Sequence, residues 1–202
     1  AVGTAGHGTV TLAAGVITYT PALNFFGTDA FDYTISDGNG GTDLGRVTLT
    51  VTNVNDPPVA VNDTLSTNED TAKNLNVVAN DSDVDNDALT IQSFTQPANG
   101  TVTFAGNVAT FTPALNFNGT TSFTYTIKDP SNTTATATVN INVIAVNDKP
   151  DAVNDAITTN EDTQSAALDL LGNDTDVDVG QTLPVTTNTT DVCSIASSAI
   201  RT

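Results

Sequence analysis

The amino-acid sequence repeats itself with a period of 92 residues, and this repeat constrains the fold more than any other feature. Residues 8–71 align with residues 100–163 without a gap, and 36 of the 64 aligned pairs are identical. The hexapeptide at 20–25, for example, returns unchanged at 112–117. A unit of this length has the size of a small β-sandwich and is longer than most solenoid units. The sequence therefore predicts a tandem array of sandwich domains.

The repeat places one complete copy between two partial copies. We expect the C-terminal part of a repeat at residues 1–55, a complete repeat at 56–148, and the N-terminal part of a third repeat at 149–202. The match to the repeat is lost after residue 183. Only the complete copy is long enough to bury a core of its own. We therefore expect the sequence to be a fragment of a longer array.

The complete copy shows the period-two alternation of half-buried β-strands and no helical stripe. Phe123, Tyr125 and Ile127, for example, alternate with threonines. Turns are expected where Pro, Gly and Asn gather between such segments. The predicted fold class is all-β: tandem seven-stranded Greek-key β-sandwiches of the immunoglobulin-like or cadherin-like type. The seven expected strands are 60–67, 72–78, 88–95, 101–105, 108–112, 121–128 and 135–146.

Acidic residues dominate the charge of the chain. There are 23 Asp and Glu against five Lys and Arg, which gives a net charge of −18. Only Glu69 and Glu161 are glutamates, and Asp favours turns and metal loops over helices. A surface this negative repels nucleic acid and anionic lipid, so we expect neither nucleic-acid binding nor membrane insertion. Cys193 is the single cysteine, so no disulfide within the chain can stabilise the fold.

The acidic residues fall in loops that the expected topology brings to the two poles of the sandwich. Strands that alternate in direction place the incoming linker at the same pole as the second-to-third and sixth-to-seventh loops. The opposite pole carries the first loop and the outgoing linker, beside the acidic loop of the following copy. The candidate metal ligands at the first pole are Asn55, Asp56, Asp81, Asp83, Asp85, Asp87 and Asp129. Those at the second pole are Glu69, Asp70, Asn147, Asp148, Asp174, Asp176 and Asp178.

Closely spaced carboxylates with no basic residue nearby repel one another by roughly 1 kcal/mol per pair or more. A hard divalent cation relieves this repulsion, and Ca²⁺ binds carboxylate, amide and backbone oxygens. The scarcity of His, Cys and Met argues against zinc, copper and iron. The loop is not an EF-hand, because Asn86 stands at the position of the required glycine. We therefore predict Ca²⁺ as the cofactor; the alternative is that these residues only form turns and keep the protein soluble.

Several motifs occur together along residues 8–183. They are the linkers at 54–58 and 146–150, the Asn-Glu-Asp-Thr blocks at 68–71 and 160–163, the acidic loop at 80–85, and the Asp-Gly-Asn-Gly-Gly turn at 37–41. As a set they resemble the calcium-stabilised cadherin-like and immunoglobulin-like tandem repeats, including the VCBS type, of very large bacterial surface adhesins such as RTX adhesins. The chain departs from that pattern at Asn86, where such repeats commonly have glycine, and at Pro130, which replaces the glycine of the first copy's turn. The resemblance implies an extracellular location, at the bacterial cell surface or secreted, calcium at the domain junctions, and a stalk role in cell adhesion or biofilm formation.

The leading functional hypothesis is a structural one, a spacer whose junctions calcium stiffens. Its expected partners are neighbouring repeats of the same chain, and cell-surface or matrix polysaccharide or protein bound through other domains. We expect no enzyme activity, because no catalytic constellation is present. The alternatives are a polysaccharide-binding module and an accessory module of a secreted carbohydrate-active enzyme. The absence of Trp, and the position of all three Tyr in expected strands, favour the spacer.

Overall fold

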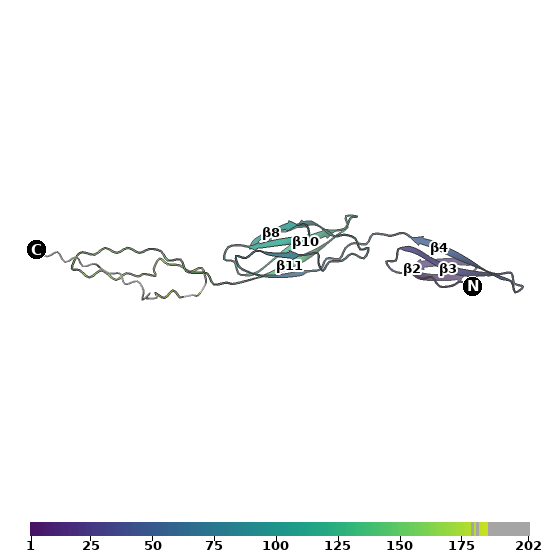
Figure 1. The fold of residues 1–202 in the computed structure, drawn as a ribbon, viewed down its shortest axis with the longest axis horizontal. Helices are drawn as coiled ribbons and strands as arrows, with labels where there is room; N and C mark the ends of the chain where they lie inside the picture. The colour runs from purple at the N-terminus through teal and green to yellow at the C-terminus, as the bar shows by residue number, and fades with distance from the viewer. Residues whose placement is uncertain (179, 181, 186–202) are drawn as a thin grey trace. The chain divides into compact units, whose positions relative to one another are not determined.

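The computed structural model describes residues 1–178, 180 and 182–185, which Figure 1 draws as a coloured ribbon. The chain divides into two compact units, Ala1–Ile144 and Ala145–Thr202. All strands of the described residues belong to the first unit. Among these residues no helix is long and apolar enough to cross a membrane. Cys193 lies outside the described residues.

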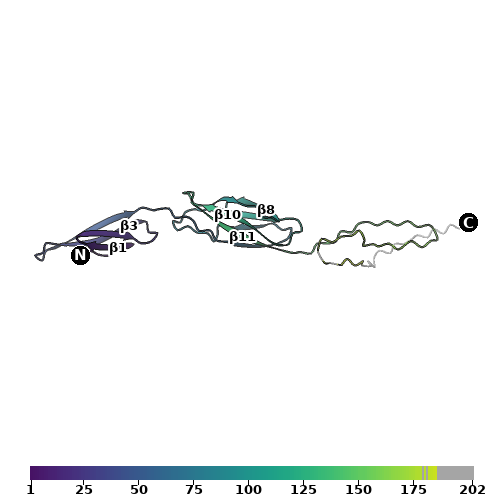
Figure 2. The ribbon, with the colours of Figure 1, turned by 180° about the vertical axis from the view of Figure 1, so that it is seen from behind.

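The middle copy is a seven-stranded β-sandwich, which confirms the predicted fold class. Its strands are β5 (Asp63–Asn68), β6 (Lys73–Asn76), β7 (Thr90–Phe94), β8 (Gly100–Ala105), β9 (Val108–Pro113), β10 (Gly119–Lys128) and β11 (Thr134–Ile144). One sheet has the order β5-β11-β10-β7, and the other has the order β6-β9-β8. Figures 1 and 2 show β8 in one layer and β10 and β11 in another.

The first and last strands of this sandwich, β5 and β11, are parallel neighbours. Their register runs from Asp63 opposite Val139 to Asn68 opposite Ile144. Seven strands that reverse direction at every connection must leave the first and the last pointing the same way, which explains the parallel pair. Strand β11 also pairs antiparallel with β10, and β10 pairs antiparallel with β7. This order brings the incoming linker, the β6–β7 loop and the β10–β11 loop to one pole.

The period-two alternation in β10 and β11 builds the core of the middle copy. Tyr125 and Ile127 are fully buried, whereas Thr126 between them is partly exposed. The buried Tyr125 hydroxyl donates to the Val77 carbonyl oxygen at 2.8 Å, so its polar end is satisfied inside the core. The other buried members of the core are Leu65, Val77, Val102, Ala109, Phe111, Phe123, Ala137, Val139, Ile141 and Val143.

Residues 1–51 form two antiparallel hairpins that correspond to the second half of the middle copy. Strand β1 (Gly8–Ala13) pairs with β2 (Val16–Pro21), and β3 (Gly27–Ser36) pairs with β4 (Thr42–Val51). At the 92-residue offset these strands are the counterparts of β8, β9, β10 and β11. Phe31 is the one apolar side chain among residues 1–51 that is fully buried, at 4% exposure. The two hairpins therefore form their strand pairs although they bury far fewer apolar side chains than the corresponding strands of the middle copy.

The described residues of the second unit contain no strand, and their one β-bridge joins Asp151 to Thr175. The pairing of the middle copy explains this difference from the expected repeat. Strands β5, β6 and β7 pair with β11, β9 and β10, and never with one another. Residues 149–183 correspond to the segment that holds β5 and β6, and the match to the repeat ends before the counterpart of β7. The first half of a repeat therefore cannot form ladders alone, whereas the second half can.

In the first copy the buried carboxylate of Asp29 joins the two hairpins, at a position where the middle copy has Thr121. It accepts hydrogen bonds from three backbone N–H groups, including that of His7 at 2.9 Å, and from the Tyr19 hydroxyl at 2.9 Å. Burial raises the pKa of Asp29, but these hydrogen bonds outweigh it and lower the pKa to about 2. The sequence repeat gave no sign of this network, because it exists in one copy only.

We expect the Asp29 network to weaken as the pH falls. The folded-state pKa of about 2 lies below the value of about 3.9 for an unfolded Asp. Ionised Asp29 therefore stabilises the fold above the unfolded pKa, and this stabilisation is lost as the pH falls from about 5 toward 2. Hydrogen exchange at the His7 amide, corrected for the intrinsic rate, measures the effect. Asp29→Asn keeps an acceptor oxygen but does not titrate, so equal pH dependence in both proteins would contradict the prediction.

Candidate metal centre

The loop between β6 and β7 is folded by the turn chemistry of its own Asp and Asn residues. The Asp85 N–H donates to Asp83 Oδ1 at 2.8 Å, and the Asn86 N–H donates to the Asp83 carbonyl oxygen at 3.2 Å. Asn86 has a φ of 61°, a left-handed conformation that Asn adopts more readily than most residues other than glycine. Asn86 thus adopts the left-handed backbone conformation at a position where the calcium-stabilised tandem repeats that this sequence resembles commonly have glycine.

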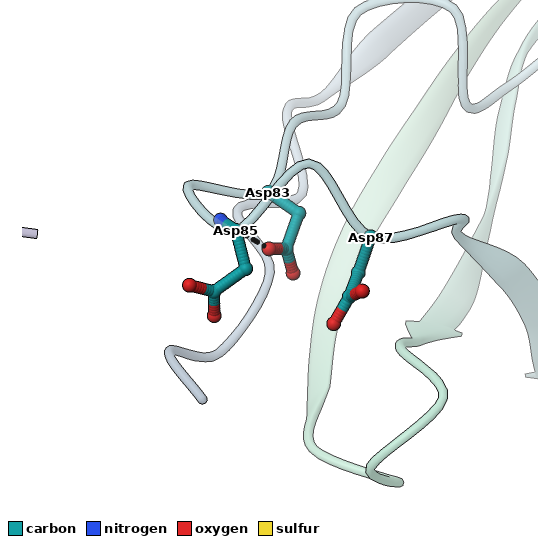
Figure 3. Close-up of side chains that lie close together, drawn as sticks. All are labelled: Asp83, Asp85 and Asp87. Atoms are coloured by element: carbon teal, nitrogen blue, oxygen red, sulfur yellow. Dashed lines mark hydrogen bonds between the residues drawn. The ribbon is translucent and has the colours of Figure 1, made fainter. Parts of the chain in front are cut away.

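Asp83, Asp85 and Asp87 form an acidic cluster on this loop. Each offers a carboxylate oxygen, and these oxygens lie within 4.8 Å of one another. Figure 3 shows that the three carboxylates point to the same side of the loop. All three side chains are partly buried. In the part of the chain that the structure describes, no other group of three or more His, Cys, Asp or Glu has this spacing.

The incoming linker and the β10–β11 loop meet the acidic loop at the same pole. The Asp56 N–H donates to Asp85 Oδ2 at 2.7 Å, which joins the linker to the acidic cluster. Asn55 Nδ2 donates to Asp129 Oδ2 at 2.8 Å, which joins the linker to the β10–β11 loop. Asp129 itself is 2% exposed and also accepts the Thr133 N–H at 2.9 Å. Six predicted ligands from three separate segments therefore gather at this pole.

The cluster carries strong negative charge in partly desolvated surroundings. Desolvation, followed by the charges of Asp83, Asp129 and Asp85, raises the pKa of Asp87. Asp129 responds in the opposite way: burial raises its pKa, but hydrogen bonds from Thr133 and Asn55 outweigh this and lower the pKa. Asp129 therefore stays ionised and adds its charge to the field at Asp87.

One oxygen of the cluster, Asp83 Oδ2, is buried and has no hydrogen-bond partner among the described residues. A buried carboxylate oxygen without a donor is costly, because the hydration that it loses is not replaced. A cation bound at this oxygen would replace the lost hydration. Ca²⁺ suits the position, because its ligands are oxygens in flexible and irregular arrangements. The residues present therefore fit a hard, oxygen-ligated cation.

Asp81, a predicted ligand of the same loop, lies apart from the cluster. Its Oδ1 accepts the Val61 N–H at 2.8 Å, and both its oxygens lie 3.2 Å from the Tyr125 hydroxyl. Asp63, which the sequence did not single out, lies 3.0 Å from the same hydroxyl. Desolvation is the main cause that raises the pKa of Asp81 and the pKa of Asp63. The negative charge of Asp81 raises the pKa of Asp63 further. Asp81 thus holds the chain against the core tyrosine.

The predicted ligands Glu69 and Asp70 lie in the turn between β5 and β6. Glu69 is 5% exposed, and Asn118 Nδ2 donates to its Oε2 at 3.4 Å. Asp70 is exposed, and its Oδ1 accepts the Asn116 N–H at 2.9 Å. These contacts hold the turn against the chain before β10. Calcium binding by this pair stays a prediction.

The second unit repeats the arrangement of the linker and the acidic loop. The Asp148 N–H donates to Asp178 Oδ2 at 2.7 Å, as Asp56 donates to Asp85. The Asp178 N–H donates to Asp176 Oδ1 at 2.9 Å. Asp174 accepts the Val153 N–H at 2.8 Å, which reproduces the contact of Asp81 with Val61. Asn147 Nδ2 donates to the Asp148 carbonyl oxygen, completing the repeated pattern of the linker.

Residues 1–50 and 55–142 match a family model described as bacterial Ig domain. These two stretches amount to more than half of the 202 residues. The chain belongs to the bacterial Ig domain family. The match covers both hairpins of the first copy and nearly all of the middle copy, so the acidic cluster lies inside a bacterial Ig domain. The resemblance drawn from the repeated motifs is thereby confirmed at the level of the family.

Solved structures similar in fold to this bacterial Ig domain protein include a cadherin. The crystal structure of human mucin-like protocadherin EC1-2 is similar with a TM-score of 0.50 and 18% identity, over 72% of this chain and 84% of that one. This likeness shows a cadherin-like fold. Endo-fucoidan hydrolase MfFcnA4 of glycoside hydrolase family 107 has 25% identity and a TM-score of 0.37, over 72% of this chain and 23% of that one. Protein GAMETE EXPRESSED 2 of Arabidopsis thaliana is 37% identical over 87 residues, which are 43% of this chain and 9% of that protein.

Proposed function

We propose that the acidic cluster of the middle copy binds Ca²⁺, and that the chain is a calcium-stiffened extracellular spacer of a bacterial surface adhesin. The observation that carries this proposal is the cluster of Asp83, Asp85 and Asp87, whose oxygens lie within 4.8 Å of one another. The buried oxygen Asp83 Oδ2, which has no hydrogen-bond partner among the described residues, supports it. Such a site relieves the repulsion that raises the pKa of Asp87.

A cation at this cluster would stiffen the chain because the cluster is already joined to the linker. Asp85 uses Oδ2 to hold the Asp56 N–H at 2.7 Å. Asn55, the preceding residue, is bound to Asp129, whose charge acts on Asp87. Fixing the carboxylates would therefore also fix the linker backbone. Ordering a linker in this way restricts the bending between neighbouring repeats.

The proposed setting is outside the cell, at the bacterial surface or in secreted form. The spacer would contact neighbouring repeats of the same chain, while other domains of the parent protein bind polysaccharide or protein in cell adhesion or biofilm formation. The tyrosines support a spacer over a sugar-binding platform. Tyr19, Tyr33 and Tyr125 lie in β2, β3 and β10, and all three are partly or fully buried.

Differential scanning calorimetry in chelator, in Ca²⁺ and in Mg²⁺ tests the proposal. We expect Ca²⁺ to raise the unfolding temperature of the middle copy, because a ligand that binds only the folded state stabilises it by mass action. At 100 times the Kd this stabilisation is about 2.7 kcal/mol. Mg²⁺ at the same concentration should do much less, since it demands a regular octahedral site. An unfolding temperature that Ca²⁺ leaves unchanged would refute the calcium site.

A further inference from the structure

A groove lies on the outer face of the larger sheet of the middle copy, apart from the core and from the acidic cluster. It runs across β5, β11 and β10 and has a volume of about 530 Å³, which is in the range typical of ligand-binding clefts. Each of the three strands contributes two exposed side chains to it. They are Thr64, Ser66, Thr120, Ser122, Asn140 and Asn142. The groove thus belongs entirely to the complete copy.

The strand register arranges the six side chains in two rows of three. In each row, an Asn of β11 lies between a hydroxyl residue of β10 and a hydroxyl residue of β5. The rows are Ser122, Asn140 and Thr64 in one, and Thr120, Asn142 and Ser66 in the other. Neighbouring strands lie about 4.8 Å apart and alternate residues of a strand about 7 Å apart, so the grid measures about 10 by 7 Å. Two amides at its centre are therefore flanked by hydroxyl groups on both sides.

The hydrogen-bonding groups of these six side chains are unused within the described part of the chain. None of their side-chain oxygen or nitrogen atoms has a hydrogen-bond partner among the described residues. Neighbouring threonines differ: the Thr126 and Thr136 hydroxyls lie 2.9 Å apart, and those of Thr124 and Thr95 lie 3.2 Å apart, each pair sharing a hydrogen bond. The groove, unlike these threonines, leaves its donors and acceptors available to an occupant.

The groove is lined by uncharged residues, although the chain has a net charge of −18. An anionic ligand would be repelled by that charge, and a cationic ligand would be drawn to the acidic cluster instead. An apolar ligand would cover the free polar groups without satisfying them. A neutral ligand rich in hydroxyl groups satisfies them, because a hydroxyl both donates and accepts hydrogen bonds and an Asn amide offers two donors and an acceptor.

We propose that this groove binds an uncharged polysaccharide, and that Asn140 and Asn142 are its central hydrogen-bonding residues. Each amide binds two neighbouring hydroxyls of a sugar ring, donating through Nδ2 and accepting through Oδ1, while the Ser and Thr hydroxyls on either side bind the adjoining rings. No aromatic side chain lines the groove, so the site differs from a platform on which sugar rings stack. Binding depends on hydrogen bonds that compete with water, and we therefore expect it to be weak.

The first copy lacks the two amides. Thr48 and Thr50 stand at the positions of Asn140 and Asn142. Threonine has a single hydroxyl where asparagine offers two donors and an acceptor. The site is therefore assigned to the middle copy, and the first copy supplies the substitution that tests it. Asn140→Thr/Asn142→Thr gives β11 the side chains that β4 has at these positions, without a change in charge.

Affinity gel electrophoresis of the 202-residue chain tests the proposal, with dextran, laminarin and mannan as neutral probes and dextran sulfate as the anionic one. At least one neutral polysaccharide should retard the chain, and dextran sulfate should not. Asn140→Thr/Asn142→Thr should weaken the binding by about tenfold or more, because four or more hydrogen-bonding groups are lost from the centre of the groove. Retardation should be equal in chelator and in Ca²⁺, which separates this site from the metal site.

Strand β6 offers a matched control for the loss of the two amides. Asn74 and Asn76 are exposed, lie two residues apart like Asn140 and Asn142, and are not part of the groove. Asn74→Thr/Asn76→Thr should therefore bind as the unmodified chain does. Threonine suits exposed strand positions, so the unfolding temperature of both double variants should stay close to that of the unmodified chain. The proposal is overturned if no neutral polysaccharide retards the chain, if dextran sulfate retards it as strongly, or if both double variants lose binding equally.

Discussion

Replacing Phe111 with alanine is expected to lower the free energy of unfolding of the middle copy by about 3 to 5 kcal/mol. Phe111 is 0% exposed and belongs to the core cluster. Its ring lies against Gly100, where an added Cβ would come within 2.6 Å of the ring. Removing the ring costs both its transfer free energy and the cavity that it leaves. Urea denaturation, monitored by circular dichroism, measures the loss.

Two further variants show that the effect of Phe111→Ala comes from burial. Leu115→Ala removes an apolar side chain that is 82% exposed, and we expect it to change the free energy of unfolding by less than about 0.5 kcal/mol. Phe111→Tyr places in the middle copy the residue that the first copy has at Tyr19. In the middle copy the added hydroxyl lacks the carboxylate acceptor that Asp29 provides to Tyr19, so we expect Phe111→Tyr to lower the free energy of unfolding. Adding Thr121→Asp, at the position that corresponds to Asp29, should make this loss smaller. A Phe111→Ala loss below about 1 kcal/mol would contradict the described core.

The double substitution Asp83→Asn/Asp85→Asn is expected to weaken Ca²⁺ binding at the acidic cluster by roughly 100-fold or more, because two negative charges next to a divalent ion are lost. Isothermal titration calorimetry measures this change. Stability in chelator should stay the same or rise, because the repulsion on Asp87 falls. Asn keeps a side-chain oxygen that can accept the Asp56 and Asp85 N–H groups, so the loop itself should persist.

A matched control removes the same charge elsewhere. Asp37 and Asp43 are both exposed residues of the first copy. Asp37→Asn/Asp43→Asn should therefore leave the Ca²⁺ affinity of the middle copy within about twofold, since these residues are not part of the acidic cluster and salt screens the interactions of exposed charges. If the two double variants lose affinity equally, the binding is a diffuse effect of net charge. If Asp83→Asn/Asp85→Asn unfolds the middle copy in chelator, these residues are structural caps.

The sequence predicted the sandwich because side-chain alternation is a direct record of which face is buried. Phe123, Tyr125 and Ile127 alternate with threonine along β10, and the structure buries those three. The prediction that the linker, the β6–β7 loop and the β10–β11 loop meet at one pole followed from strand direction alone. Contacts of Asp56 with Asp85 and of Asn55 with Asp129 confirm this meeting. Their role as metal ligands remains part of the proposal.

Contacts between distant residues set the limit of the sequence reasoning. Asp81 has the same spacing as the three aspartates of the cluster, yet Tyr125, 44 residues away, draws it toward the core. No local pattern distinguishes it from Asp83. Asp29 was missed because its partners are mostly backbone N–H groups, which leave no mark in the sequence. The described part of residues 149–185 has no strands because the strands of the first half of a repeat pair with strands of the second half. Such pairing between distant segments cannot be predicted from the sequence of one segment alone.

The parallel pair of β5 and β11 determines how the middle copy responds to tension. The chain enters this sandwich at β5 and leaves it at β11, so pulling on the two linkers drags these neighbouring strands in opposite directions. Their six paired positions are then loaded in shear, all together, rather than opened one after another from an end. A ladder loaded in shear must break several hydrogen bonds in a single event. The topology of the repeat therefore gives mechanical strength along the direction in which a tether is pulled.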